Sequence, residues 1–163
     1  MKELLVIRHA KSSWANPGQD DFDRPLNDRG HKDAAEMAKR LVKKGIKIDR
    51  LISSPALRAL TTAEYFARAF HQKTSAIVQA EELYLAPASV YDKVIKNLPN
   101  ELNTVAIFAH NPGITDFVLE TETARIDHMP TCAIFGIRLH TDDWAKVRTC
   151  AKDFWVFDYP KLH

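Results

Sequence analysis

Cysteine is scarce in this chain, with only Cys132 and Cys150 among 163 residues. Two cysteines are too few for a disulfide framework, and their spacing does not match that of metal ligands. Cysteine-poor chains of this kind usually keep their thiols reduced inside the cell. We therefore expect no bound metal, no disulfide and a cytoplasmic location.

Long apolar runs and a strong charge of one sign are also lacking. No stretch is long enough to span a membrane. The run from Leu4 to Ile7 is too short for the core of a signal peptide, and the charged Arg8 follows it directly. The 23 basic and 21 acidic residues give a formal net charge of +2, which argues against bulk electrostatic binding of nucleic acid. Any selectivity for anions must come from a local cluster.

Length and patterning indicate the fold class. A chain of 163 residues, 45% of them hydrophobic and 27% charged, suits one globular domain over residues 1–163. Short apolar runs alternate with longer amphipathic segments, which predicts a three-layer α/β/α sandwich with a mostly parallel sheet. The late strands could add an antiparallel strand at the edge.

The expected elements follow from apolar spacing and from capping signals. Asn27 or Asp28 can cap the first helix, which Gly45 ends. Ser54-Pro55 and Asn111-Pro112 each combine a capping side chain with a proline of the first turn. We expect strands at about 4–7, 51–52, 76–78, 104–108, 133–139 and 154–157, helices at about 27–44, 54–70, 87–98 and 111–120, and a long polar loop over residues 11–26.

Three of these strands end in polar clusters. The first cluster is Arg8-His9, the second runs from Ser53 to Arg58, and the third runs from His110 to Gly113. Ligands of open parallel sheets bind beyond the carboxyl ends of the strands, so these clusters should converge. Arginine forks bind phosphate oxygens in pairs, and the free amides of helix starts attract anions. The convergence predicts a site for a phosphoryl group, in which phosphate or sulfate could also bind.

These motifs resemble the histidine phosphatase superfamily, whose fold is that of phosphoglycerate mutase. The similarity is greatest to its short SixA-like branch of phosphohistidine phosphatases and covers nearly the whole chain. The matching segments, in chain order, are Arg8-His9-Ala10-Lys11-Ser12-Ser13-Trp14, Asp23-Arg24-Pro25-Leu26 with Arg29-Gly30, Ser53-Ser54-Pro55-Ala56-Leu57-Arg58-Ala59 and Ala109-His110-Asn111-Pro112-Gly113. The chain has Ala10 where many members of the wider family have glycine.

The resemblance implies a role for each residue of the clusters. His9 would attack phosphorus and become a phosphohistidine, which water then hydrolyses without a metal or other cofactor. Arg8, Arg58 and His110 would hold the phosphoryl oxygens and stabilise the charge of the transition state. His9 must be neutral at the attacking nitrogen, so a partner on its other ring nitrogen is expected, although the sequence does not show which group this is.

The general acid is open at this stage. Glu82 occupies the place at which longer family members have a proton-donating glutamate, and Asp21 or Asp23 in the long loop is a rival. A solvated surface acid is an equally good interpretation of Glu82. A phosphohistidine substrate has less need of such an acid, because its leaving imidazole has an ordinary pKa of about 6.5.

The substrate we expect is a phosphohistidine-containing protein. The chain lacks the insertions that enclose the substrate in phosphoglycerate mutases, which favours an open, shallow site. One alternative is a phosphomonoesterase for a small metabolite, and another is a phosphate-binding module without turnover. Trp14 could line the mouth of the site or pack the loop. The remaining histidines, expected to be structural or at the surface, are His31, His71, His128, His140 and His163.

Overall fold

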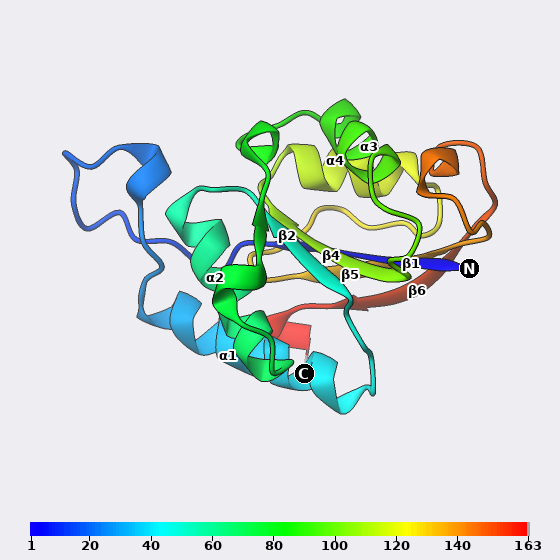
Figure 1. Ribbon diagram of the computed structural model, residues 1–163. Helices are drawn as coiled ribbons and strands as arrows, with labels where there is room; N and C mark the ends of the chain where they lie inside the picture. Colours follow the sequence, from blue (N-terminus) through cyan, green and yellow to red (C-terminus); the bar gives the residue numbers. More distant parts are fainter. Residues whose placement is uncertain (163) are drawn as a thin grey trace.

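A central strand with buried residues on both faces organises the molecule. In the computed structural model, which describes residues 1–162, β1 (Lys2–Arg8) has Leu4, Leu5 and Ile7 fully buried. An apolar side chain at successive positions is what a strand covered on both faces requires. β1 accordingly lies in the middle of the sheet, between a parallel and an antiparallel neighbour (Figure 1). His163, expected at the surface, lies outside the described residues.

The sheet has six strands in the order β3-β2-β4-β1-β5-β6. The five other strands are β2 (Arg50–Ser53), β3 (Val78–Gln79), β4 (Thr104–Ala109), β5 (Ile134–Leu139) and β6 (Lys152–Asp158). The first four strands of this order are parallel, which confirms the expected mostly parallel sheet. The antiparallel strand was expected at the edge, but it is β5, one place inside it, because β6 pairs antiparallel with β5.

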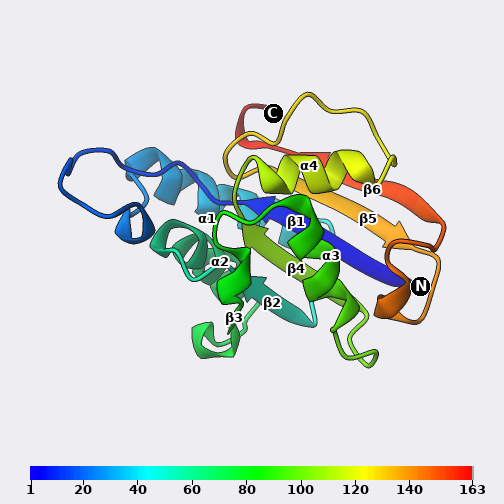
Figure 2. The same cartoon turned by 90° about the horizontal axis from the view of Figure 1, so that it is seen from above.

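Two helices cover each face of the sheet, which confirms the α/β/α sandwich (Figures 1 and 2). The helices are α1 (Asp28–Lys43), α2 (Leu57–Ala69), α3 (Ala88–Lys96) and α4 (Gly113–Glu120). α1 and α2 bury Met37 and Phe66 against one face. α3 and α4 bury Tyr91 and Phe117 against the other, with the two rings stacked 5.3 Å apart.

The signals for the first helix are confirmed. Asn27 is the N-cap of α1, and its side-chain oxygen accepts a hydrogen bond from the amide of Gly30 at 2.8 Å. Gly45 has a φ of 74°, the left-handed conformation that glycine adopts most easily after a helix.

Two of the proposed capping side chains, Ser54 and Asn111, bond to other segments instead of capping a helix. α2 begins at Leu57 with Ala56 as its N-cap, so Ser54 does not cap it. The Ser54 hydroxyl instead lies 2.8 Å from a ring nitrogen of His110. α4 begins after Pro112, and the side chain of Asn111 donates to the carbonyl of Met129 at 3.0 Å. Both polar residues are therefore used to join separate segments at the strand ends.

The other differences are shifts of element boundaries. The strand expected at 76–78 is displaced to β3, because residues 74–76 form a 3-10 turn. α3 ends at Lys96, two residues before the expected end. Among residues 1–162, no helix combines the length and the apolar character needed to cross a bilayer.

Strand register brings the polar clusters together. Arg8 pairs with Ala109 across β1 and β4, and Ser53 pairs with Phe108 across β2 and β4. Beyond these pairs the His9 amide donates to the Ala109 carbonyl at 3.1 Å. The residues that follow β1, β2 and β4 thus lie together beyond the carboxyl ends of these strands, as the sequence predicted.

The start of α1 lies directly on the backbone that follows His9. The Asn27 amide donates to the Lys11 carbonyl at 3.0 Å. A Cβ atom added to Gly30 would lie 2.1 Å from that same carbonyl oxygen, which is far inside van der Waals contact. Only glycine lets the helix approach this closely, so Gly30 helps to fix the path of the chain out of the site.

We expect Gly30→Ala to destabilise the protein by about 3 kcal/mol, because the new methyl group must displace backbone rather than a flexible side chain. The free energy of unfolding in urea measures this. Gly18→Ala is the matched control, since its Cβ would meet only the Asn16 side chain at 3.8 Å, and it should change stability by less than about 0.5 kcal/mol. Equal stabilities of the two variants would contradict this account of the α1 contact.

Candidate active site

The imidazole of His9 has one ring nitrogen, Nε2, with an unshared electron pair. Its Nδ1 lies 2.7 Å from the carbonyl oxygen of Ala10. A carbonyl oxygen can only accept a hydrogen bond, so Nδ1 carries the proton and Nε2 of the neutral ring has the lone pair. The partner that the sequence could not identify is therefore a main-chain carbonyl one residue away.

Burial keeps the His9 ring uncharged. The side chain belongs to a residue that is only 7% exposed, and this burial is the main reason that the pKa of His9 falls from 6.5 to about 3. The hydrogen bond to Ala10 opposes the shift, whereas the charges of Arg58 and Arg8 add to it. Near neutral pH the imidazole is therefore uncharged, with an unshared electron pair on Nε2.

His110 lies beside His9, with the two ring centroids 5.2 Å apart. Its Nε2 is 2.8 Å from the hydroxyl of Ser54, while its buried Nδ1 has no hydrogen-bond partner within residues 1–162. Burial, followed by the charge of Arg58, lowers the pKa of His110 to about 3. A buried ring nitrogen without a partner is rare in folded proteins and indicates a place where a ligand could bind.

The guanidinium of Arg8 is fixed by a main-chain carbonyl of the segment that precedes β5. Its Nη1 donates to the Met129 carbonyl at 2.9 Å, and its buried Nε has no partner within the described residues. Burial and the adjacent Arg58 lower the pKa of the Arg8 guanidinium. Two guanidinium groups thus lie close enough to repel each other, which favours the entry of an anion between them.

Asp21 holds Arg58 in place, and the sequence named it only as a rival acid. Arg58 is 3% exposed and donates from Nη2 to the Asp21 carboxylate at 3.0 Å and from Nη1 to the Asp21 main-chain oxygen at 2.7 Å. The Tyr84 hydroxyl donates to the same carboxylate at 2.5 Å. The hydrogen bond from Tyr84 is the main reason that the pKa of Asp21 falls to about 2, with Arg58 and Arg24 contributing. Asp21 is therefore a fixed carboxylate.

Arg24 organises the long loop over residues 11–26. It is 8% exposed, forms an ion pair with Asp21 at 3.0 Å and donates to the main-chain oxygen of Ser13 and the hydroxyl of Ser12. Its guanidinium carbon lies 3.3 Å from the ring centre of Trp14, whose other face remains in solvent because Trp14 is 76% exposed. Trp14 thus both packs the loop and lines the mouth of the site.

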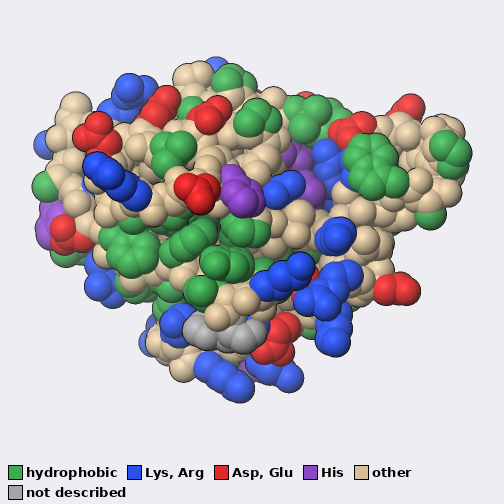
Figure 3. Space-filling model, turned by 180° about the vertical axis from the view of Figure 1, so that it is seen from behind, with side chains coloured by type: hydrophobic (Ala, Val, Ile, Leu, Met, Phe, Trp, Pro, Cys, Tyr) green, Lys and Arg blue, Asp and Glu red, His purple; other side chains and the backbone are tan. Residues whose placement is uncertain are grey.

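These groups surround an open pocket of about 600 Å³. In Figure 3 it is the hollow in which histidine side chains lie next to lysine and arginine side chains. Within the described residues, no acidic side chain is among those that line it. The residues of the lining are Arg8, His9, Lys11, Ser12, Ser13, Trp14, Ala15, Arg24, Asn27, Arg58, Leu85, His110, Asn111 and Thr131.

The structure thus brings four of the predicted site residues together and leaves the fifth apart. Arg8, His9, Arg58 and His110 all line the pocket. Glu82 lies in a short 3-10 turn (Glu81–Leu83), is exposed, and is not among the lining residues. It is two residues from Tyr84, the partner of Asp21, and three residues from Leu85, which does line the pocket.

The remaining histidines stand apart from this pocket. The Nδ1 atom of His31 lies 2.7 Å from the Tyr65 hydroxyl, and the Nε2 atom of His140 lies 2.6 Å from Asp153. His71 is exposed. Over residues 1–162 there is no group of three or more histidine, cysteine or acidic side chains arranged to hold a metal ion.

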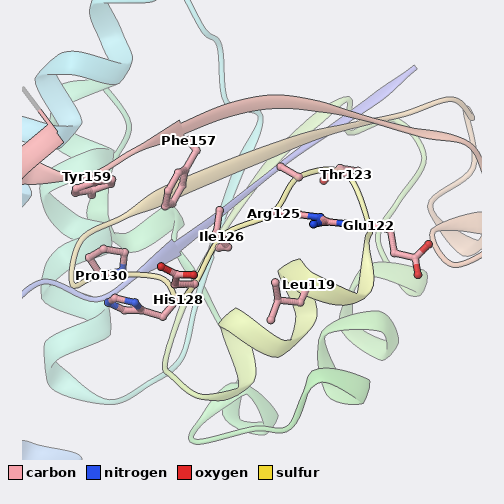
Figure 4. A pocket seen from close by; sticks show the side chains of 11 residues that line it. Leu119, Glu122, Thr123, Arg125, Ile126, His128, Pro130, Phe157 and Tyr159 are labelled. Atoms are coloured by element: carbon pink, nitrogen blue, oxygen red, sulfur yellow. The ribbon is translucent and has the colours of Figure 1, made fainter.

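A second, larger hollow of about 1140 Å³ lies between the end of α4, the segment 122–130 and β6 (Figure 4). Leu119 extends toward it from α4, and Phe157 points from β6 toward Ile126. His128 also lines it, but none of the four converging residues does. Arg8, His9, Arg58 and His110 therefore lie together only at the smaller of these two pockets.

Comparisons with known proteins agree with this geometry. The family model of the histidine phosphatase superfamily (branch 1) matches residues 4–85. An uncharacterized protein of Mycobacterium leprae is 32% identical over 117 residues, which cover 69% of each chain.

Two solved structures are similar over nearly the whole chain. A protein assigned as the phosphohistidine phosphatase SixA of Agrobacterium tumefaciens is 26% identical, with a TM-score of 0.81 and 98% of both chains covered. The protein histidine phosphatase SixA in complex with tungstate is 22% identical, with a TM-score of 0.81 and 96% of both chains covered. The expected phosphoglycerate mutase-like fold is confirmed.

We expect His9 to stay neutral from pH 8 to pH 5 in phosphate-free buffer, since its pKa in the folded protein is about 3. Nitrogen-15 NMR of the imidazole should show a protonated Nδ1 and an unprotonated Nε2 throughout this range. The chain unfolded in urea is the control, because free imidazoles titrate near 6.5. A folded-state His9 signal that titrates near pH 6.5 would refute the neutral ring.

Proposed function

Because the chain belongs to the histidine phosphatase superfamily, we propose that it is a phosphohistidine phosphatase, which removes a phosphoryl group from a phosphohistidine in a protein. The observation that carries the proposal is the neutral imidazole of His9, with its Nε2 lone pair beside two guanidinium groups. The tungstate bound by a protein of the same fold supports a phosphate-like ligand for this pocket.

The reaction proceeds in two steps with His9 as nucleophile. Nε2 attacks phosphorus in line and the new N–P bond forms. The bond from phosphorus to the substrate's imidazole breaks, and this ring, which carries a proton on its other nitrogen, leaves as neutral imidazole with the electron pair on the released nitrogen. Water then attacks the phospho-His9 intermediate, releases inorganic phosphate and restores the neutral ring. Dividing the transfer in this way replaces one difficult step with two easier ones. The Ala10 carbonyl accepts a hydrogen bond from Nδ1–H, which keeps the proton on Nδ1 and partly compensates the positive charge that develops on the ring.

Arg8, Arg58 and His110 bind the phosphoryl oxygens in this proposal. The Met129 carbonyl and the Asp21 carboxylate orient the two guanidinium groups before the ligand arrives. The Ser54 hydroxyl can donate to Nε2 of His110, which leaves Nδ1–H to donate to an oxygen of the substrate. Donors fixed in advance stabilise the charge of a transition state without reorganisation. The arginines supply the positive charge, so we propose that no metal ion or other cofactor takes part.

The shape of the pocket favours a protein-borne substrate over a free metabolite. It is open, and two exposed apolar side chains, Trp14 and Leu85, stand among its lining residues. Such a rim can contact the surface around a phosphorylated side chain. Both thiols are free, Cys132 within the core, and this supports the reducing cytoplasm as the place of action.

We expect the covalent intermediate to form on His9 and nowhere else. Labelled phosphate from a phosphohistidine protein should remain on the wild-type enzyme after a quench without acid. His9→Ala should retain less than about 1% of this label, because it removes the attacking atom. His31→Ala is the matched control and should label as the wild type does. Label that persists in His9→Ala would exclude this nucleophile.

We propose Glu82 as the general acid, and we expect it to matter only when the leaving group is a poor one. Glu82→Gln should lower kcat/KM for an alkyl phosphate about 100-fold and for phosphohistidine less than about threefold, since imidazole leaves with little help. Steady-state kinetics with both substrates test this. Glu81→Gln, in the same exposed turn, is the control. Equal losses for both substrates would contradict a role as general acid.

A further inference from the structure

A strongly basic surface extends away from the pocket along α1 and the end of the chain. It consists of two adjoining hollows of about 380 and 430 Å³. Six cationic side chains and only two acidic ones line them within the described residues. The cations of this basic surface are Lys11, Arg29, Lys32, Lys39, Arg40 and Lys161, and the acids are Asp33 and Glu36.

The basic surface is continuous with the pocket. Lys11 and Thr131 line both the pocket and the nearer hollow, while Arg29 and Pro160 line both hollows. Figure 3 shows this arrangement, with lysine and arginine side chains gathered below and beside the recessed histidines. A partner that places one group in the pocket would therefore cover these cations at the same time.

Among residues 1–162, the lysines of this surface form no ion pair. Arg29 forms an ion pair with Asp33 at 3.1 Å, and Arg40 forms one with Asp158 at 3.3 Å. The four lysines are exposed, and their side chains make no hydrogen bond or ion pair with residues 1–162. These four are Lys11, Lys32, Lys39 and Lys161. Because the whole chain has a net charge of only +2, this concentration is a property of one face.

We propose that the basic surface docks an acidic face of the phosphoprotein substrate, next to the phosphohistidine that enters the pocket. The proposal rests on the function proposed above and adds the chemistry of the partner. Lys32 and Lys39 are seven residues apart on α1, so they lie about two turns or roughly 10 Å apart on one side of the helix. Carboxylates at that spacing on a partner helix or turn would meet both.

An acidic side chain within the basic surface favours a protein over a nucleic acid as the partner. The exposed Glu36 interrupts the row of cations and would repel a continuous chain of phosphates. A protein face, on which acidic and other side chains alternate, avoids this repulsion. Complementary charge of this kind accelerates and orients encounter, and salt weakens its effect.

The test uses two synthetic phosphohistidine peptides, one with aspartate and glutamate around the phosphohistidine and one with serine and glycine. The double variant Lys32→Glu/Lys39→Glu changes the basic surface and leaves the residues of the pocket intact. Lys93→Glu/Lys96→Glu on α3 is the control, because these lysines are exposed on the other face of the sheet and the net charge changes equally.

We expect the wild type to prefer the acidic peptide about tenfold in kcat/KM at low salt, within the range known for electrostatic steering. Lys32→Glu/Lys39→Glu should abolish this preference while hydrolysis of free N-phosphorylhistidine stays unchanged, and the control should keep it. A wild type without preference, a double variant that retains it, or a control that loses it equally would overturn the proposal.

Binding of the unphosphorylated acidic peptide, measured by fluorescence anisotropy, separates the two proposals. A Kd about tenfold weaker in Lys32→Glu/Lys39→Glu than in wild type and control supports docking even if neither phosphopeptide is hydrolysed, and in that case only the proposed function fails. Equal Kd values overturn docking. A Lys32→Glu/Lys39→Glu variant that loses binding of duplex DNA or anionic vesicles, but binds the peptide as the wild type does, would also overturn the docking proposal.

Discussion

Two guanidinium groups and two imidazoles lie together, largely buried, at the carboxyl ends of the central strands. Their mutual repulsion stays small only while both imidazole rings are neutral. Protonation of His9 or His110 would add a third positive charge where Arg8 and Arg58 already repel each other. Burial secures the neutral form, and the same neutrality leaves a lone pair on His9. In the proposed function, the neutrality that makes the ligand-free site electrostatically stable also leaves His9 able to attack a bound phosphoryl group, whose negative charge would relieve the repulsion.

The counter-charge comes from a single carboxylate that stands just outside the pocket. Asp21 accepts from Arg58, Arg24 and Tyr84 and is fixed by all three. It does not line the pocket, so it orients Arg58 without taking the place of a phosphoryl group. Three donors also explain why Asp21 stays ionised, which makes it a poor source of protons. The loop over residues 11–26 is thus long because it must carry Asp21 and Arg24 back across the strand ends.

The sequence was most informative where local chemistry and sheet geometry decide the outcome. Burial of Leu4 to Ile7 required a central strand, and parallel strands have their carboxyl ends on one edge, so the convergence of His9, Arg58 and His110 was predictable. The partners of these groups were not. From the sequence, Ser54 is a helix cap, whereas in the structure the neighbouring strand brings His110 to its hydroxyl. Likewise, Asp21 is only a loop acid in the sequence, and its contact with Arg58 depends on how the loop folds back. Such pairings depend on distances between segments that local patterns do not encode.

The attachment of Arg58 to Asp21 ties the readiness of the pocket to the integrity of a surface loop. Arg58 grows from α2, a rigid element, but its guanidinium is aligned by groups of the 11–26 loop. Loops open locally at far lower free energy than sheets, as hydrogen exchange in many proteins shows. Local opening of that loop would therefore release the Arg58 guanidinium from Asp21 while the six-stranded sheet stays folded.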